Sequence, residues 1–168
     1  GNLSVDISQT CTPDPNPPHA PVCVDDCAMT LTGDSITAFR QGLSVQGGRD
    51  GEQPANLNIT FTRDSADFTV KNPAQGSDHL VTLQETTAPD APAGYFNLGK
   101  AYRFVFASSY DGVVVKMYSL DPNYTPEDLS RIRLMAYHDD GTSEDITTNA
   151  AANCITGETT TTSIFTLI

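Results

Sequence analysis

The chain of 168 residues has no tryptophan, only three lysines, and only 18% charged residues. It also has no run of the roughly eighteen apolar residues that a membrane-spanning helix needs, so we expect no membrane insertion. Nine basic residues stand against 21 acidic ones, which gives a formal net charge of −12. Because nucleic acids and anionic membrane surfaces would repel such a chain, neither is an expected partner.

Thr, Ser, Gly, Pro and Asn are abundant instead, while hydrophobic residues make up 38% of the chain. This balance is typical of short, solvated strands joined by many turns. The length is sufficient for one well-filled core. Gly1 stands where an initiator Met is usual, and no signal peptide opens the sequence. We therefore expect a processed or excised chain that is secreted or displayed at the cell surface.

The cysteines are even in number, and three of the four lie in one proline-rich region: Cys11, Cys23, Cys27 and Cys154. In an exported protein the default is two disulfides, and four cysteines allow three pairings that the sequence does not resolve. Only three residues separate Cys23 from Cys27, so we expect each to bond elsewhere, one of them to Cys154. The alternative is a thiolate metal site with His19 nearby, although the spacing is not C-x-x-C.

The N-terminal residues Leu3, Val5 and Ile7 alternate with polar residues, which is the period of a half-buried strand. The prolines that follow make residues 12–21 a stiff, exposed loop, and the cysteines on both sides are expected to clamp its ends. Two roles are open for the strand. It either completes the sheet of a neighbouring copy, by strand donation from residues 1–8, or pairs within its own chain.

Further segments alternate in hydrophobicity or are rich in β-branched and aromatic residues. We expect strands at residues 27–31, 35–45, 58–62, 67–70, 79–84, 101–106, 113–118, 131–137, 144–147, 154–156 and 161–167, with 36–39 alternatively a short helix. Thr125 before Pro126 predicts a helix of about one turn, and Asp139-Asp140-Gly141 predicts a hairpin turn. The fold class is therefore all-β: an Ig-like antiparallel β-sandwich with an N-terminal strand extension and a Pro-rich, disulfide-clamped loop.

Three short sequences in the second half carry a resemblance: residues 91–95 (APAGY), residues 137–141 (YHDDG) and residues 163–167 (SIFTL). Together they make residues 58–168 similar to a β-sandwich module found near the ends of large bacterial and archaeal secreted and cell-surface proteins. The resemblance implies a non-catalytic module at 58–168. It leaves residues 1–57 unassigned, and we expect these N-terminal strands and the Pro-rich loop to pack on the sandwich. We interpret residues 88–94 as a corner that ends one strand and leads the chain across to the other sheet.

Two details depart from that module. Thr142 follows the turn glycine, where an aromatic residue is usual in that module. Residues 163–165 (Ser-Ile-Phe) also differ from the His-Phe-Ser sequence at which some related sandwiches cleave themselves, so we expect no self-cleavage. A second, weaker similarity links residues 83–89 to the B modules of pilin-type collagen adhesins. There a buried acid promotes a Lys–Asn cross-link, for which Glu85 would be the acid. The lysines available for it are Lys71, Lys100 and Lys116.

Groups that could carry chemistry are scattered. His19, His79 and His138 lie far apart and no Gly-x-Ser-x-Gly accompanies them, so we expect no catalytic triad and no enzyme activity. Acidic pairs offer calcium ligands, but they lack the Asp-x-Asp-x-Asp-Gly order of a dedicated loop. We expect no cofactor and leave calcium open. The acidic pairs are at residues 25–26, 139–140 and 144–145.

Two kinds of carbohydrate signal are present. The acceptor pattern Asn-x-Ser/Thr makes Asn2, Asn58 and Asn123 candidates for glycosylation. Exposed tyrosines could form a platform on which sugar rings stack, although Tyr102 and Tyr118 fall on expected core strands. The six candidates for such a platform are Tyr95, Tyr102, Tyr110, Tyr118, Tyr124 and Tyr137.

From these observations we expect a non-enzymatic extracellular structural or assembly protein, such as a surface-layer, filament or cell-surface module. Its expected partners are copies of itself or other surface-protein subunits. The alternative is a carbohydrate- or cell-wall-binding module, for which a polysaccharide would be the partner.

Overall fold

The structure is a computed structural model that describes residues 2–9, 27–32, 35–39, 57–71, 73, 78–118, 120–151 and 153–168. For the described residues up to 39, and for residues 57, 78 and 79, it describes the backbone only. Within the described residues, no helix has both the length and the apolar character needed to cross a membrane.

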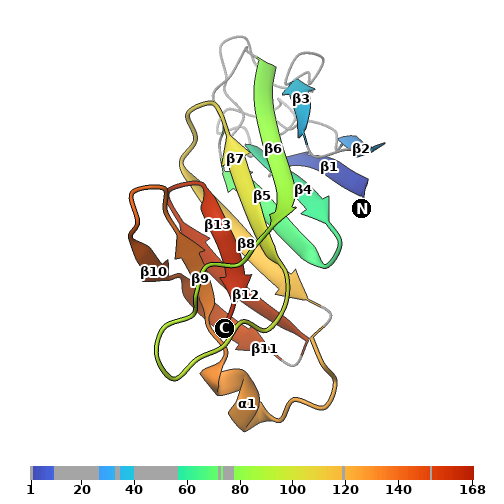
Figure 1. Ribbon diagram of the computed structural model, residues 1–168. Helices are drawn as coiled ribbons and strands as arrows, with labels where there is room; N and C mark the ends of the chain where they lie inside the picture. The colour runs from blue at the N-terminus through green and yellow to red at the C-terminus, as the bar shows by residue number, and fades with distance from the viewer. Residues whose placement is uncertain are drawn as a thin grey trace, which may run out of the picture.

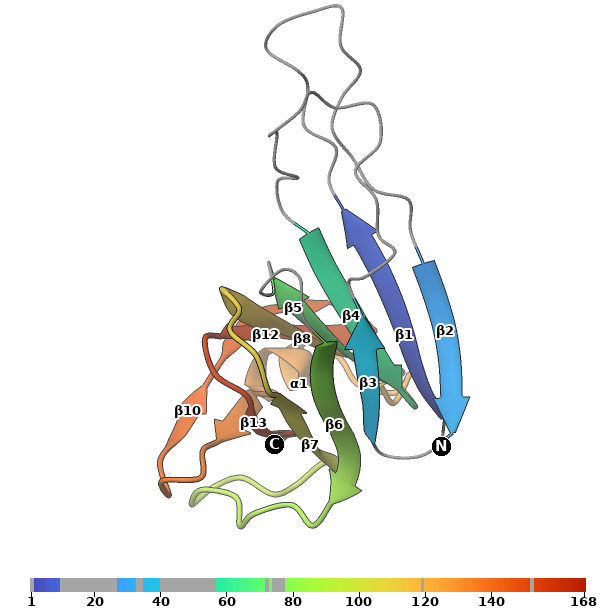
Figure 2. The same cartoon turned by 90° about the horizontal axis from the view of Figure 1, so that it is seen from above.

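Two antiparallel sheets face each other, which confirms the predicted β-sandwich (Figures 1 and 2). The seven-stranded sheet has the order β11 (Thr147–Ala151), β12 (Cys154–Thr159), β8 (Gly112–Tyr118), β5 (Ala66–Lys71), β4 (Leu57–Arg63), β1 (Asn2–Gln9) and β2 (Cys27–Thr32). The six-stranded sheet has the order β10 (Ser143–Asp145), β9 (Leu134–Tyr137), β13 (Ser163–Leu167), β7 (Ala101–Phe106), β6 (Asp78–Thr86) and β3 (Ser35–Phe39). A short helix, α1 (Pro126–Arg131), lies at one end of the sandwich.

Alternating side chains of the strands build the core. Every second residue of β5 is buried, and β4 buries Ile59, Phe61 and Arg63. The centre is aromatic: the rings of Phe68 and Phe104 stack with their centroids 5.0 Å apart. Arg63 Nη1 reaches across the core and donates to the Leu83 carbonyl at 2.7 Å, so a buried cation joins the two sheets. The period of two in the sequence is therefore the cause of the layered fold.

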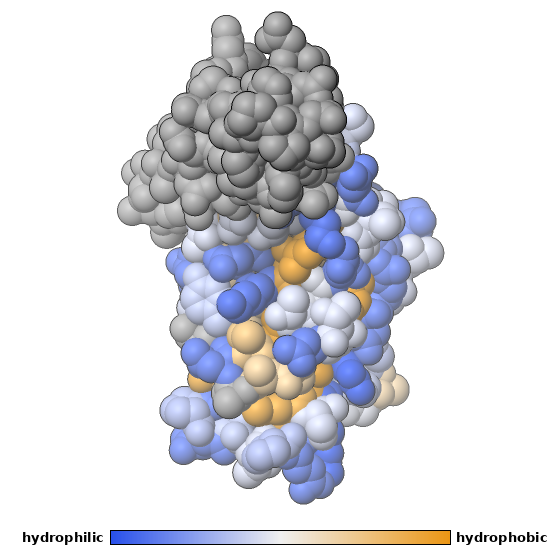
Figure 3. Space-filling model, turned by 180° about the vertical axis from the view of Figure 1, so that it is seen from behind, coloured by the Kyte–Doolittle hydropathy of each residue, from blue (hydrophilic) through white to orange (hydrophobic). Residues whose placement is uncertain are grey.

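The outer face of the seven-stranded sheet is largely polar (Figure 3). The hydroxyls of Thr60 on β4 and Thr69 on β5 are 2.9 Å apart, and Thr62 donates to Asp67 at 2.7 Å. These cross-strand pairs hold neighbouring strands in register without apolar burial. They account for the threonine-rich, half-polar strands that the sequence indicates.

The N-terminal strand β1 lies inside the seven-stranded sheet of its own chain, between β4 and β2. Its register sets Val5 opposite Phe61 and Ile7 opposite Ile59, two positions at which β4 faces the core. The intrachain arrangement, one of the two alternatives, is thus the one in the structure. Exchange of this strand between copies stays a prediction, as does a division into parts at 1–57 and 58–168.

The strand expected at residues 144–147 is divided in two. β10 ends at Asp145 in the six-stranded sheet, and β11 begins at Thr147 in the seven-stranded sheet. Between them Ile146 is buried, and its N–H donates to the Leu134 carbonyl at 2.9 Å. The Asp145 carboxylate accepts from the Thr147 N–H at 3.0 Å and so stabilises the bend. The expected strand at 131–137 is also shorter, because α1 extends to Arg131.

The proline-rich corner does not lead to the other sheet. β6 and β7, which it connects, are antiparallel neighbours in the same sheet, so that part of the prediction is wrong. Figure 1 shows the connection crossing in front of β13 and β9. Met135 and Thr166 alternate with core residues on these two strands and are nevertheless buried. The connection therefore covers the outer face of the six-stranded sheet, where the Leu98 N–H donates to the Leu167 carbonyl at 3.0 Å.

The sheet order also restricts the disulfides. Cys154 begins β12 and Cys27 begins β2; the path β12–β8–β5–β4–β1–β2 contains five strand spacings. At about 4.8 Å per spacing the two strands are about 24 Å apart across the sheet, whereas the Cα atoms of a disulfide are roughly 4.4–6.8 Å apart. A Cys27–Cys154 bond is therefore excluded, and the Cys154 thiol is free. The predicted bond from Cys23 or Cys27 to Cys154 is therefore wrong. Cys11 and Cys23 lie outside the described residues, so pairings among Cys11, Cys23 and Cys27 stay predictions.

Candidate functional site

Two adjoining hollows lie at the end of the sandwich that carries α1. The first, which we call the Asp64 hollow, measures about 440 Å³, and the second, the Phe96 hollow, about 480 Å³. They share Leu98 and Tyr124 as a common wall, and we call the pair the tyrosine groove. The β4–β5 turn, the segment before β7, the end of β8 and α1 contribute to it. Its polar and aromatic lining residues are Asp64, Ser65, Tyr95, Phe96, Lys100, Tyr102, Tyr118, Asp121, Tyr124, Asp128 and Arg131.

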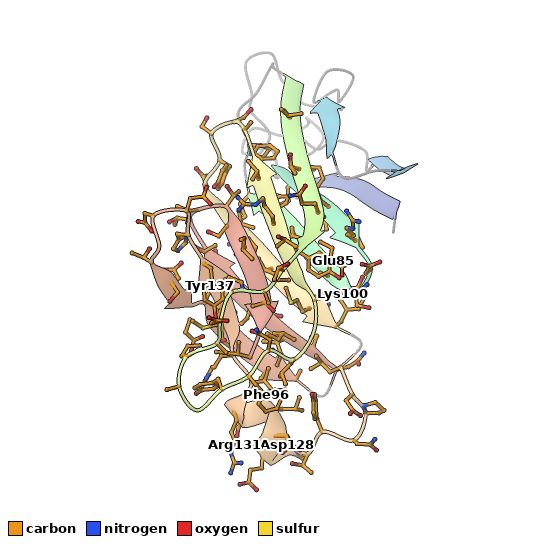
Figure 4. All side chains as sticks on the ribbon, viewed as in Figure 1. Glu85, Phe96, Lys100, Asp128, Arg131 and Tyr137 are labelled. Atoms are coloured by element: carbon orange, nitrogen blue, oxygen red, sulfur yellow. The ribbon has the colours of Figure 1, made fainter. Side chains whose placement is uncertain are left out.

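Asp64 organises one wall of the Asp64 hollow. It occupies the tight β4–β5 turn with φ of 53°, a left-handed conformation that aspartate tolerates better than most residues. Its Oδ2 accepts from the Tyr102 hydroxyl at 3.1 Å and lies 3.5 Å from Lys100 Nζ. Lys100 Nζ is also 3.4 Å from Glu85 Oε2 (Figure 4). The ammonium thus lies between two carboxylates.

Charges and burial set the ionisation of this network. Burial raises the pKa of Asp64, but the Tyr102 hydroxyl and the Lys100 ammonium outweigh it and hold that pKa below the usual value. The Asp64 and Glu85 carboxylates raise the pKa of Lys100. Burial, and then the charge of Asp64, raise the pKa of Tyr102. At neutral pH the site therefore contains a charged carboxylate, a charged ammonium and a neutral phenol.

A second tyrosine is held in the same way. The Tyr118 hydroxyl donates to Asp67 Oδ1 at 3.3 Å, and the Tyr118 N–H donates to the Ser65 carbonyl at 2.9 Å. Burial, with the charge of Asp67 next, raises the pKa of Tyr118. Both tyrosines on this side of the groove have their hydroxyls tied to carboxylates, so their rings have defined orientations.

The Phe96 hollow is more apolar and displays its aromatic rings. The exposed fractions are 74% for Phe96 and 44% for Tyr95, which is unusual for large rings. Gly94, with φ of 88°, precedes them in a turn that the Tyr95 N–H closes by donating to the Pro92 carbonyl at 3.0 Å. Figure 4 shows Phe96 beside α1. The turn therefore presents two rings to solvent at the mouth of the hollow.

The opposite wall is α1, whose start is fixed by local chemistry. Thr125 Oγ1 accepts from the Asp128 N–H at 3.1 Å, and Asp128 Oδ2 accepts from the Thr125 N–H at 2.9 Å, a capping box. The backbone bond from Thr125, and then its hydroxyl, lower the pKa of Asp128. Arg131, one turn later, pairs with Glu127. The helix start predicted at Thr125 and Pro126 is confirmed.

The structure brings together four of the six tyrosines that the sequence nominated, namely Tyr95, Tyr102, Tyr118 and Tyr124. Tyr110 lies elsewhere and packs edge-on against Phe106, with ring centroids 5.8 Å apart. The Tyr137 hydroxyl is buried without a hydrogen-bond partner in the described part of the chain. Phe96 is a residue that sequence reasoning missed.

A second polar cluster surrounds His138. Its Nδ1 is 2.5 Å from the Ser163 hydroxyl, and its Nε2 is 3.6 Å from Glu144 Oε1, an order of groups that resembles a Ser–His–acid triad. Ser163, however, is buried, and its hydroxyl donates to the Thr162 carbonyl at 2.6 Å. The cluster lines neither hollow of the tyrosine groove. We interpret it as a tie between the β9–β10 hairpin and β13. The His79 side chain and all of His19 lie outside the described residues.

The Lys–Asn cross-link suggested by the resemblance to adhesin B modules needs a lysine beside Glu85 and an asparagine next to both, and only the first condition is met. Lys100 does lie beside Glu85, but the third group is Asp64 where the cross-link requires an asparagine. Two carboxylates also favour the charged form of Lys100, whose amine is then not nucleophilic. Lys71, another candidate, pairs with Glu158 across the seven-stranded sheet.

The remaining candidates stay separate. Among the described residues no three His, Cys, Asp or Glu side chains gather as metal ligands, and residues 25–26 lie outside them. Asp140 accepts from the Thr142 hydroxyl at 2.6 Å within the predicted hairpin turn. Asn123 is exposed in a turn and Asn58 is half-buried on β4, while Asn2 is placed only by its backbone on β1.

No family model matches the sequence, and no curated protein or solved structure shows significant similarity to it. The inference about function therefore rests on the residues of the tyrosine groove.

Proposed function

We propose that this protein is a non-enzymatic, extracellular β-sandwich module that binds carbohydrate, and that the tyrosine groove is its binding surface. The observation that carries the proposal is the convergence of Tyr95, Phe96, Tyr118 and Tyr124 on two adjoining hollows, with Tyr102 buried behind them. The apolar faces of sugar rings stack on aromatic rings, and sugar hydroxyls bond to carboxylates and ammonium groups. The groove offers both kinds of group side by side, in concave form.

The aromatic part of the site is preorganised. The Tyr102 and Tyr118 hydroxyls are held by carboxylates, and the Gly94 turn, closed by the Tyr95 N–H, fixes the backbone that carries Tyr95 and Phe96. Rings that are already ordered lose little conformational entropy when a ligand binds. The exposure of Phe96 is a cost to the free protein that a bound sugar ring would relieve.

Polysaccharide pull-down and glycan-array binding test the proposal with the variants Phe96→Ala and Tyr124→Ala. Each removes one ring of the groove and should weaken binding at least about tenfold, or about 1.4 kcal/mol. The matched control is Tyr110→Ala, which removes a ring at the other end of the sandwich and should leave binding unchanged. The proposal is wrong if no polymer binds, or if all three variants bind as the wild type does.

A second candidate is the structural or assembly role, as a surface-layer, filament or cell-surface module. The observation that favours it is the position of β1, which is hydrogen-bonded on both sides and is the N-terminal strand of its sheet. A terminal strand of this kind can be exchanged between copies at little cost in contacts, because the same pairs re-form between chains. The partner would then be a second copy or another surface subunit.

Electron microscopy of material from the native source and light scattering of a chain lacking residues 1–8 test this role. Filaments or lattices, together with loss of self-association in the truncated chain, would support strand exchange. A wild-type protein that remains monomeric at high concentration, and a truncated chain that is equally stable, would argue against it.

Several finer features belong to the same proposal: the Ig-like arrangement, the N-terminal extension, the disulfide-clamped loop, glycosylation and the similarity to modules of secreted proteins. The acidic, threonine-rich composition supports an extracellular location. Mass measurement with and without reductant counts the disulfides. Alkylation of the native protein should label Cys154, whose thiol is free. Resistance of Cys154 to alkylation, with release by reductant, would contradict this.

A further inference from the structure

The charges of the tyrosine groove indicate which kind of carbohydrate it binds. The acids that line the groove are Asp64, Asp121 and Asp128, and the bases that line it are Lys100 and Arg131. Three further acids, Asp67, Glu85 and Glu127, contact lining residues from beside the groove. The local net charge of these eight groups is therefore 2 − 6 = −4.

Both bases already have anionic partners within the chain. Lys100 lies between Asp64 and Glu85, at 3.5 and 3.4 Å. Arg131 pairs with Glu127 one helical turn before it. An acidic sugar would have to compete with these carboxylates for either cation, and it would approach a surface whose net charge repels it. The groove is therefore unsuited to uronic acids and sulfated sugars.

Asp121 is available to a ligand on its outer side. One of its carboxylate oxygens, Oδ1, accepts from the Asn123 N–H at 2.9 Å, and the residue is exposed where it lines the Asp64 hollow. Tyr124, in the shared wall, follows three residues later, and its N–H donates to the Asp121 carbonyl at 3.1 Å. The turn thus places a carboxylate and an aromatic ring close together at the meeting point of the two hollows.

This combination of groups attracts a positively charged ligand in two ways. A carboxylate attracts an ammonium by its charge, and the face of an aromatic ring attracts it through the ring quadrupole. We propose that the groove selects polysaccharides that carry free amino groups, that is polymers of unacetylated hexosamine, over neutral and acidic polysaccharides. The inference rests on the proposed carbohydrate function and adds the ligand class.

Equilibrium binding of the whole chain to three soluble probes tests the inference: partly deacetylated chitosan, fully N-acetylated chitin oligosaccharides and polygalacturonate. We expect chitosan to bind at least about tenfold more tightly than the N-acetylated probe at a pH below the pKa of the sugar amine. That advantage should shrink as salt rises, because the added attraction is electrostatic.

The matched variants are Asp121→Asn and Asp139→Asn. Asp121→Asn keeps the side-chain oxygen that accepts from Asn123, so the turn is preserved while the charge is lost. It should reduce binding of chitosan several-fold more than it reduces binding of the N-acetylated probe, because only chitosan loses an ammonium–carboxylate attraction. Asp139→Asn removes an exposed carboxylate that pairs with Arg103 outside the groove and should alter neither.

The outcomes separate the two proposals. Equal, salt-independent binding of chitosan and the N-acetylated probe would overturn the amine selectivity and leave carbohydrate binding intact. Tighter binding of polygalacturonate would also overturn the selectivity. Failure to bind any of the three probes would overturn the amine selectivity, and failure to bind any polymer in the pull-down and on the glycan array would overturn carbohydrate binding as well. Tighter binding of a polylysine peptide than of chitosan would show that the cationic ligand is not a carbohydrate.

Discussion

Replacing Gly157 by alanine should destabilise the protein, because the sandwich closes tightly around this position of β12. A Cβ atom there would lie 2.7 Å from the Ile146 carbonyl oxygen, 2.8 Å from Ile146 Cγ1 and 2.9 Å from Leu134 Cδ2. All three separations are shorter than a van der Waals contact. The carbonyl cannot withdraw freely, since it accepts from the Glu158 N–H at 3.0 Å.

The magnitude follows from the atoms that must move. Overpacking a filled core by one methyl group costs about 1–3 kcal/mol. We expect Gly157→Ala to fall within this range, because the Ile146 carbonyl and the side chains of Ile146 and Leu134 would all have to move. For a protein of this size, each kcal/mol corresponds to about 2–4 °C in Tm, so Tm should fall by about 2–12 °C.

Urea denaturation followed by circular dichroism measures the effect, with the midpoint lowered and the m value unchanged. Gly99→Ala is the matched control. A Cβ atom at Gly99 meets no atom within 4 Å, so the variant should be neutral or more stable by up to about 1 kcal/mol through the unfolded state. If Gly157→Ala were as stable as Gly99→Ala, the close approach of Ile146 to β12 would be refuted.

Three further changes have definite expected outcomes. Phe68→Ala removes a fully buried ring that contacts Phe104 and should cost about 3–5 kcal/mol of unfolding free energy in the same assay, and a loss below 1 kcal/mol would contradict the aromatic core. Thr125→Ala removes the cap of α1 and should cost about 1 kcal/mol, whereas an unchanged midpoint would mean that the capping box is not formed in solution. The pKa of Asp64 is lowered in the folded state. Its ionised carboxylate therefore adds to the free energy of unfolding above the unfolded pKa of 3.8, and this stabilisation is lost as the pH falls through the folded pKa. The wild type should therefore have a larger free energy of unfolding than Asp64→Asn at pH 6, and this difference should become smaller towards pH 2. A difference that grows on acidification would contradict the lowered pKa of Asp64.

Part of the candidate site was recognisable in the sequence. The sequence predicts all six tyrosines as one possible platform. It does not distinguish Tyr110 and Tyr137 from the four that converge, because convergence depends on contacts between strands that are distant in the sequence. Phe96 carries no strand or helix pattern, so no local signal marked it as exposed. The role of Asp64 was also hidden, since its partners Tyr102 and Lys100 are 38 and 36 residues away along the chain.

Local chemistry, which a sequence displays directly, determined the individual elements. The period of two in β5 and the capping residues before α1 act over a few neighbouring residues, and the turn at Gly141 adopts the positive φ of 88° that favours glycine. The all-β fold class follows from the same local patterns. These features needed no knowledge of distant parts of the chain.

The tertiary structure alone decided how those elements combine. It set β1 between β4 and β2, moved the chain from one sheet to the other at Ile146, and laid the proline-rich connection over β13 and β9. Sheet order also separated Cys27 from Cys154. Each of these outcomes depends on pairing and packing between residues far apart in the chain, where many arrangements satisfy the same local pattern and only burial of the whole core selects one.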